Sequence, residues 1–186
     1  DWLGIKYDSV EHVSDNLDIL YEKADQIIKS NDAYVCTCSQ DSISKDRREM
    51  TECGCTKQSV EDNEKLWHKM FDEKGFKEGQ ALLRFRGNMQ SGNTTMRDPA
   101  LFRINTKRHA RQEQKYKVWP TYDFAGIIFD SISKVSHAMR SKEFELRKEL
   151  HHTILDKLGM EKSEFIFFGR LDLEGMPVSK SALKPL

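Results

Sequence analysis

The four cysteines of the chain lie within 20 residues of one another, as the pairs Cys36-Thr37-Cys38 and Cys53-Gly54-Cys55. Two such pairs can supply a tetrahedral set of thiolates for Zn²⁺, with Zn–S bonds of about 2.3 Å. A site with four cysteine ligands leaves no open coordination position, so zinc held there is structural. The alternatives are disulfides, which require pairing between the two turns, and free thiols or another use of the cysteines. The absence of a signal-peptide pattern at the N-terminus favours reduced thiols. We therefore expect structural zinc on Cys36, Cys38, Cys53 and Cys55.

A second group with chemical potential lies near the C-terminus, where Lys180 stands between Ser179 and Ser181. A lysine ammonium on a flexible stem suits a developing phosphate charge, and neighbouring serines can order the loop. The pattern is common on surfaces and does not identify a site by itself. The sequence has no Gly-Lys-Ser/Thr phosphate loop, Gly-x-Gly-x-x-Gly, His-Glu-x-x-His or Gly-x-Ser-x-Gly motif. His151 and His152 are adjacent on an expected helix, so their rings point apart, and we interpret them as surface residues.

The 186 residues suffice for one domain, or for one domain with an insertion. Thirty basic and thirty acidic side chains give a net charge of zero, which alone argues against nucleic-acid binding. Residues 1–75, however, carry 10 basic and 17 acidic side chains, and residues 76–186 carry 20 and 13. The densest basic stretch contains Arg103, Lys107, Arg108, Arg111, Lys115 and Lys117. Mean hydropathy is −0.69, and no run approaches the roughly 20 apolar residues of a membrane helix.

Periodicity predicts the elements that position these groups. Helices are expected at 14–29, 59–74, 123–134 and 144–158, and strands at 33–35, 81–86, 100–105, 118–120, 135–139 and 165–168. Ser59 with Asp62 indicates a capping box, and Gly159 a helix end. Helices and strands alternate in the C-terminal part, which favours an α/β fold with a parallel sheet. The more irregular stretch 36–117 indicates an insertion in that frame.

Several segments together resemble one enzyme family, and they do so in the same order along nearly the whole chain. The segments are Asp1–Ile5, Ala33–Val35, Ser59–Asn63, Met96-Arg97-Asp98-Pro99, Leu101–Ile104, Trp119–Phe124, Ser136–Phe144 and Val178–Ser181. They resemble the catalytic core of glutamyl- and glutaminyl-tRNA synthetases of the archaeal and eukaryotic type. The resemblance implies a partial class I synthetase Rossmann-like parallel sheet with an inserted α+β, zinc-containing domain that binds the tRNA acceptor stem. It divides the chain into catalytic parts at 1–35 and 118–186 and an insertion at 36–117.

The resemblance also implies roles for individual residues. Tyr122 matches the tyrosine that holds the amino acid, and Arg140 occupies the position that carries arginine in glutamyl enzymes and cysteine in glutaminyl enzymes. Arg170 and Leu171 match the segment that borders the adenine pocket. Lys180, with Ser179 and Ser181, matches the catalytic KMSKS loop.

The implied function is ATP-dependent activation of glutamate and its transfer to tRNA(Glu), with Mg²⁺ on the ATP, in the cytoplasm. None of the six histidines forms the His-x-Gly-His motif of class I enzymes, so we expect the chain to be a fragment that lacks this motif and the anticodon-binding domain and is inactive alone. The alternatives are a glutaminyl-tRNA synthetase, or a non-catalytic zinc-stabilised module that binds tRNA or protein. Tyr122, Arg140 and Lys180 favour the enzyme, since a purely binding relic need not keep all three.

Overall fold

The computed structural model describes residues 3–4, 6–7 and 10–169 of the chain. Arg170, Leu171, Ser179, Lys180 and Ser181, for which we expect ATP-binding and catalytic roles, therefore lie outside the described residues. The helices are α1 (Leu17–Lys29), α2 (Gln40–Glu49), α3 (Val60–Phe71), α4 (Tyr122–Ile132) and α5 (Arg147–Leu158), with short 3-10 helices η1 (Val13–Asp15), η2 (Gly54–Lys57), η3 (Thr94–Met96) and η4 (Lys142–Phe144). The strands are β1 (Ala33–Cys36), β2 (Leu82–Phe85), β3 (Ala100–Ile104), β4 (Val118–Pro120), β5 (His137–Ser141) and β6 (Glu164–Phe168).

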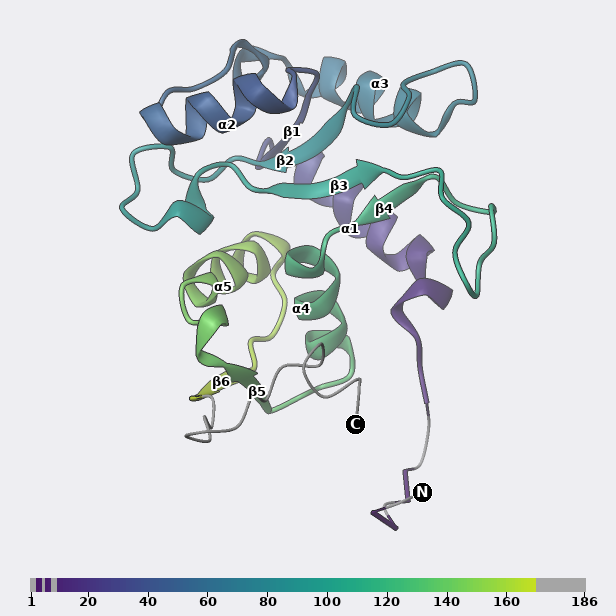
Figure 1. Cartoon of the computed structure of the whole chain (residues 1–186), viewed down its shortest axis with the longest axis vertical. Coiled ribbons are helices and arrows are strands. Elements are labelled where there is room, and N and C mark those ends of the chain that lie inside the picture. Colours follow the sequence, from purple (N-terminus) through teal and green to yellow (C-terminus); the bar gives the residue numbers. More distant parts are fainter. Residues whose placement is uncertain (1–2, 5, 8–9, 170–186) are drawn as a thin grey trace, which may run out of the picture.

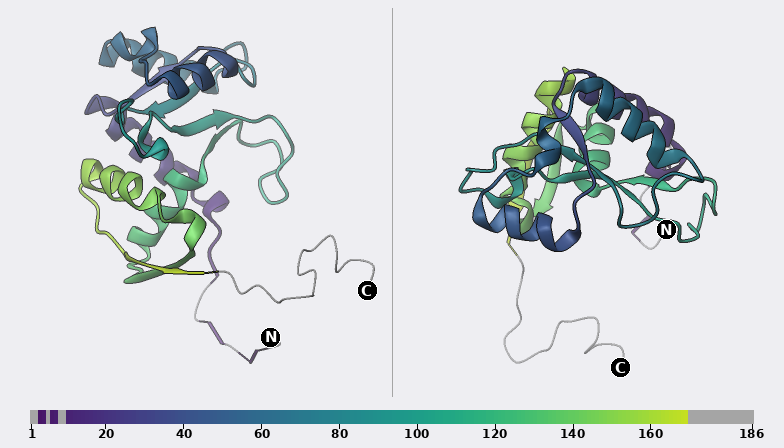
Figure 2. Two further views of the ribbon diagram at one scale, coloured as in Figure 1. Left: turned by 60° about the vertical axis from the view of Figure 1, so that its left-hand side comes forward. Right: turned by 90° about the horizontal axis from the view of Figure 1, so that it is seen from above.

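A four-stranded antiparallel sheet in the order β1-β2-β3-β4 occupies the middle of the molecule. In Figure 1, α2 and α3 lie above this sheet and α4 and α5 lie below it. Helix α1 contacts both α3 and α5, so it links the helices drawn above the sheet with those drawn below it. Figure 2, seen from two further sides, shows the same sheet with helices around it. No helix in the described part of the chain is long and apolar enough to span a membrane.

The two faces of β1 and β2 have different partners, because successive side chains of a strand point to opposite faces. Val35 and Leu83, which are directly opposite each other, belong to the main hydrophobic core together with side chains of α1, α3, α4 and α5. On the other face, Tyr34 and Cys36 pack into a small second cluster with Cys53. The sheet thus separates the main core from the cysteines.

The C-terminal part confirms the expected alternation of helix and strand. Strands β5 and β6 are parallel, with Ala138 opposite Phe165 and Arg140 opposite Phe167, and α5 forms the connection between them. Parallel neighbours need such a crossover because a short hairpin cannot reverse the chain direction. The chain therefore has a mixed α/β architecture, with one antiparallel and one parallel sheet among the described residues.

Several local predictions are confirmed. Helix α1 buries one stripe of residues: Leu17, Leu20, Ala24, Ile27 and Ile28. The side chain of Ser59 caps α3 by accepting a hydrogen bond from the backbone N of Asp62, at 3.1 Å. Gly159 follows α5 with a positive φ angle of 62°, as a helix end of this type requires.

Other predictions are wrong. Helix α2, inside the cysteine segment, was not expected. Helix α3 ends at Phe71 and not at 74, because Asp72 is already extended. Arg84 alternates with Leu83 and Phe85, a pattern typical of a solvent-facing side chain, yet it is 1% exposed. His151 was expected at the surface and is also 1% exposed.

Candidate functional site

The structure brings the four cysteines together at the end of β1. Cys36 closes β1, and Cys53 precedes η2, which contains Cys55. Helix α2 fills the interval between the two pairs and is capped by the side chain of Ser39, which accepts a hydrogen bond from the backbone N of Ser42. The sequence therefore folds back so that both cysteine pairs meet.

The sulfur atoms have the spacing of a four-coordinate metal centre. The Sγ atoms of Cys36 and Cys53 are 3.9 Å apart, and those of Cys38 and Cys55 are 3.8 Å apart. All four lie within 4.8 Å of one another. A regular tetrahedron with Zn–S bonds of about 2.3 Å has S···S edges of about 3.8 Å. All four cysteines have free thiols, and these separations are nearly twice the roughly 2.05 Å of a disulfide bond.

The two cysteine pairs differ in their surroundings. Cys36 and Cys53 are buried, whereas Cys38 and Cys55 are partly exposed. Burial raises the pKa of the Cys36 thiol and of the Cys38 thiol, because it penalises the thiolate. A bound divalent cation reverses this tendency, since a coordinating thiol is deprotonated. The residues present thus fit a zinc ion, which needs four thiolates at this spacing.

The loop that contains Asp98 fixes the sheet next to the cysteines. The Asp98 carboxylate accepts hydrogen bonds from Oη of Tyr34 and from the backbone N of Gly87, both at 2.9 Å. Asp98 has a φ of 42°, which is uncommon for a residue with a side chain. A Cβ on Gly87 would lie 1.9 Å from the carbonyl oxygen of Met96, so no side chain fits there.

Tyr122 and Arg140, the expected amino-acid-binding residues, lie next to each other in space. Tyr122 begins α4 and is 55% exposed, and Arg140 lies on β5 and is 8% exposed. The guanidinium carbon of Arg140 is 5.5 Å from the ring centroid of Tyr122 and 4.7 Å from that of Phe165. Tyr122 also lines a cavity of about 530 Å³, together with Trp119 and residues of the segment before α1.

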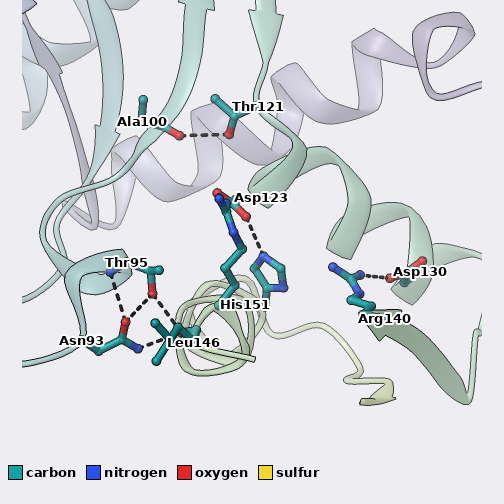
Figure 3. A network of polar contacts seen from close by, with 10 residues as sticks. Asn93, Thr95, Ala100, Thr121, Asp123, Asp130, Arg140, Leu146 and His151 are labelled. Atoms are coloured by element: carbon teal, nitrogen blue, oxygen red, sulfur yellow. Dashed lines mark hydrogen bonds and ion pairs between the residues drawn. The ribbon is translucent and has the colours of Figure 1, made fainter. Parts of the chain in front are cut away.

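The two terminal nitrogens of the Arg140 guanidinium differ in their hydrogen bonding. Its Nη2 donates to Oδ2 of Asp130 at 2.6 Å, as Figure 3 shows. Its Nη1 is buried and has no hydrogen-bond partner among the described residues. A guanidinium pairs well with a carboxylate through its fork of donors. Arg140 therefore has donor capacity left for an anionic group.

Asp123, the residue after Tyr122, holds the start of α4 against α5. Its carboxylate pairs with Nη1 of Arg147 and lies 3.0 Å from Nε2 of His151 (Figure 3). Burial alone would raise the pKa of Asp123, but hydrogen bonds from His151 and Arg147 outweigh it and hold the pKa below its ordinary value. Sequence reasoning missed this cluster because nothing in the adjacent pair His151-His152 indicates which ring turns inward.

A short polar network connects the loop before β3 to Leu146, the residue that precedes α5. Asn93 donates to the carbonyl oxygen of Leu146 at 2.8 Å, and Thr95 donates to that oxygen at 2.9 Å. Thr121 donates to the carbonyl oxygen of Ala100 at 2.9 Å (Figure 3). These bonds link the sheet with the α4–α5 unit that carries Tyr122.

The basic stretch begins on β3 with Arg103 and continues through the long loop to β4; this loop projects from the sheet in Figure 1. Some of its charges have internal partners. Arg111 pairs with Asp15 at 2.6 Å and Arg108 with Glu113 at 2.8 Å. In the described part of the chain, the side chains of Arg103, on β3, and of Lys107, in the loop, have no ion-pair partner, so this stretch keeps positive charge for an external anion.

Comparison with known proteins covers the whole chain. The family described as "tRNA synthetases class I (E and Q), catalytic domain" matches residues 1–186. A protein of Cenarchaeum symbiosum named glutamate--tRNA ligase is 52% identical over 186 residues, and one of Nitrosopumilus maritimus with the same name is 51% identical. The chain is covered completely in both comparisons and spans about a third of each relative, 33% and 32%.

A solved structure has the same fold. The glutamate-tRNA synthetase from Elizabethkingia anophelis aligns with 99% of this chain and 41% of its own, with a TM-score of 0.64. The sequence identity of 19% is low, so this likeness concerns the fold alone.

Proposed function

Because the chain belongs to the catalytic-domain family of class I glutamyl- and glutaminyl-tRNA synthetases, we propose that it is the core of a glutamate–tRNA ligase. The observation that carries this proposal is the match over all 186 residues, with relatives above 50% identity that are named glutamate--tRNA ligase. The chain spans about a third of those relatives, so the activity belongs to the full-length protein that contains it.

The proposed reaction has two steps. A carboxylate oxygen of the glutamate α-carboxyl group attacks the α-phosphorus of Mg-bound ATP, and pyrophosphate leaves. A ribose hydroxyl of the terminal tRNA nucleotide then attacks the carbonyl carbon of glutamyl-adenylate, and AMP leaves. The contribution of the protein is mainly positioning and charge stabilisation. Lys180, with Ser179 and Ser181, is proposed for the phosphates, and Arg170 with Leu171 for the adenine side.

Arg140 is proposed to select glutamate over glutamine. Its Nη1, which has no partner within the described part of the chain, supports this role, as does the position of its guanidinium beside the ring of Tyr122. Tyr122 is proposed to hold the substrate's amino-acid part. A neutral amide would give the buried Nη1 no charged acceptor, so the second charge-assisted pair of this guanidinium would be lost, at a cost on the order of 2–5 kcal/mol.

Zinc is proposed as a structural ion on Cys36, Cys38, Cys53 and Cys55. The S···S separations of 3.8–3.9 Å support it. The ion would join β1 to the segment after α2 and thereby fix a part of the fold that has few buried apolar residues of its own. A four-thiolate site also needs reduced cysteines, which fits the cytoplasm, the location we propose.

Residues 36–117 are proposed as the insertion that binds the tRNA acceptor stem, between catalytic parts at 1–35 and 118–186. The exposed basic loop between β3 and β4 supports this, because phosphate contacts supply affinity without base specificity. The antiparallel sheet itself runs from Ala33 to Pro120, so its edge strand β1 crosses the first boundary and its other edge strand β4 lies just beyond the second.

The direct test is aminoacylation by the full-length protein. Radiolabelled glutamate or glutamine is incubated with ATP, Mg²⁺ and tRNA, and acid-precipitable label is counted. The proposal expects ATP-dependent labelling of tRNA with glutamate and little with glutamine. Preferential labelling with glutamine would establish the glutaminyl alternative, and tRNA binding without labelling by either amino acid would establish a non-catalytic binding module.

A further inference from the structure

Arg84 is a fully buried cation on the cysteine side of the sheet. It lies on β2 directly opposite Tyr34 and is 1% exposed. The guanidinium carbon lies 5.6 Å from the ring centroid of Tyr34. A buried charge is costly unless it is paired and hydrogen-bonded, so the partners of Arg84 decide why an arginine is there.

The partners of Arg84 are sulfur atoms and a carbonyl oxygen. Its Nη1 lies 3.8 Å from Sγ of Cys36 and 3.8 Å from Sγ of Cys53. Its Nε donates to the carbonyl oxygen of Asp98 at 2.8 Å. Its Nη2 is buried and has no hydrogen-bond partner in the described part of the chain.

No carboxylate among the described residues forms an ion pair with Arg84. The nearest acidic residue in its network, Asp98, contacts it only through the main chain, and the Asp98 carboxylate is occupied by Tyr34 and Gly87. Neutral thiols cannot offset a buried positive charge. Four thiolates around a divalent cation carry a net charge of about −2 and can do so.

We propose that Arg84 is a positioning residue of the metal centre, which offsets the negative charge of the thiolates through Cys36 and Cys53. This inference rests on the proposed zinc site. Groups that hydrogen-bond to a metal ligand without touching the metal orient that ligand and tune its donor strength. Removing such a group typically costs 10–100-fold in metal affinity. Arg84 contacts only the buried pair of sulfurs, so the cluster is asymmetric: Cys38 and Cys55 lie on the side nearer to solvent.

The test uses the full-length protein with Arg84→Met, Arg84→Lys and, as a matched control, Arg103→Met. Arg103 lines the same cavity as Arg84, beside Cys38, but makes no sulfur contact. Zinc content is measured first, in wild-type protein purified without chelator. Zinc affinity is then measured by competition with a chromogenic chelator, and the cobalt-substituted proteins are examined for their thiolate-to-metal charge-transfer band.

We expect about one zinc per wild-type chain. Zinc affinity should fall roughly tenfold or more in Arg84→Met and less in Arg84→Lys, and it should not change in Arg103→Met. We also expect the charge-transfer band of Arg84→Met to move to lower energy, because removing a nearby positive charge makes the sulfurs better electron donors. A purely structural role for Arg84 would not move this band. If Arg84→Met does not fold, Arg84→Lys is compared with Arg103→Met instead. The lysine ammonium lacks the planar fork of the guanidinium, so its zinc affinity and charge-transfer band should still differ from those of the control.

Wild-type protein without zinc would refute the metal site and this inference with it. Wild-type protein that holds zinc, together with folded Arg84 variants of unchanged affinity and spectrum, would refute the role of Arg84 and leave the metal site intact.

Discussion

Arg140 and Asp130 form an ion pair across two consecutive elements: Nη2 of Arg140, on β5, donates to Oδ2 of Asp130, near the end of α4, at 2.6 Å. The Arg140 side chain is 8% exposed and that of Asp130 28% exposed. A charge-assisted hydrogen bond of this kind holds the guanidinium in one orientation. Among the residues that the structure describes, Nη1 has no hydrogen-bond partner, and Arg140 also lies beside the ring of Tyr122.

Asp130→Asn should weaken the use of glutamate without affecting ATP. The variant removes the charge that orients Arg140, so we expect the KM for glutamate to rise about tenfold, equivalent to about 1.4 kcal/mol. The KM for ATP should stay within about twofold. The measurement is ATP–pyrophosphate exchange by the full-length protein in the presence of tRNA. Asp156→Asn, which breaks the exposed pair with Lys162, serves as control, and equal effects of both variants would contradict the positioning role.

Asp123→Asn should destabilise the protein at neutral pH and much less in acid. The folded pKa of Asp123 is lowered, so its stabilisation is complete above the unfolded value near 3.9 and is lost as the pH falls through the folded value. At pH 7 the variant leaves Arg147 and the buried His151 without their carboxylate, which costs about 3 kcal/mol. Urea unfolding at pH 7 and at about pH 3 measures the difference. If the difference in unfolding free energy between the wild type and Asp123→Asn is the same at both pH values, the charge of Asp123 is not what stabilises the protein.

Tyr21→Phe should reduce the sensitivity of the protein to alkali. Burial raises the pKa of Tyr21, and its Oη donates to the carbonyl oxygen of Val118 at 2.7 Å. Because the folded pKa is raised, the stabilisation by the neutral Tyr21 hydroxyl is complete below about pH 10, the unfolded value. It is lost as the pH rises above that value towards the folded pKa. Thermal unfolding at pH 8 and pH 10.5 should therefore show a smaller drop for Tyr21→Phe than for the wild type. Tyr7→Phe, at an exposed position, should behave as the wild type does.

Cys38→Ser should abolish zinc binding and lower the melting temperature of the full-length protein. Because the metal binds only the folded site, its loss removes the stabilisation that binding supplies. Elemental analysis of zinc and thermal unfolding with and without chelator measure both effects. Ser44→Ala, at an exposed position on α2 between the two cysteine pairs, is the control that should keep its zinc. The zinc assignment fails if the chelator leaves the melting temperature of the wild type unchanged and Cys38→Ser melts at that same temperature.

The elements that an apolar stripe or a cap defines could be predicted from the sequence. Helix α1 buries every fourth or third residue, so its periodicity is visible without a structure. The Ser59 cap and the Gly159 end depend on local backbone chemistry alone, which a short segment carries in full. The clustering of the four cysteines followed from their spacing, and the structure confirms that they meet.

The features that depend on distant partners could not be predicted. Helix α2 has no buried residue, so it gives no periodic signal. Arg84 alternates with Leu83 and Phe85 as a solvent-facing residue would, but the cysteine segment covers that face. His151 turns inward because Asp123, 28 residues earlier in the chain, offers it a carboxylate. In each case the decisive contact lies outside the local sequence window.

The most direct test of the proposed function is the amino-acid specificity of Arg140→Cys in the full-length protein. Values of kcat/KM for glutamate and glutamine, and the KM for ATP, are measured by ATP–pyrophosphate exchange with tRNA present. A selecting role for Arg140 predicts that kcat/KM for glutamate falls by about 100-fold or more, as the loss of a buried charge pair implies, while the KM for ATP is unchanged. Glutamate activation that survives the substitution at the wild-type rate would contradict it.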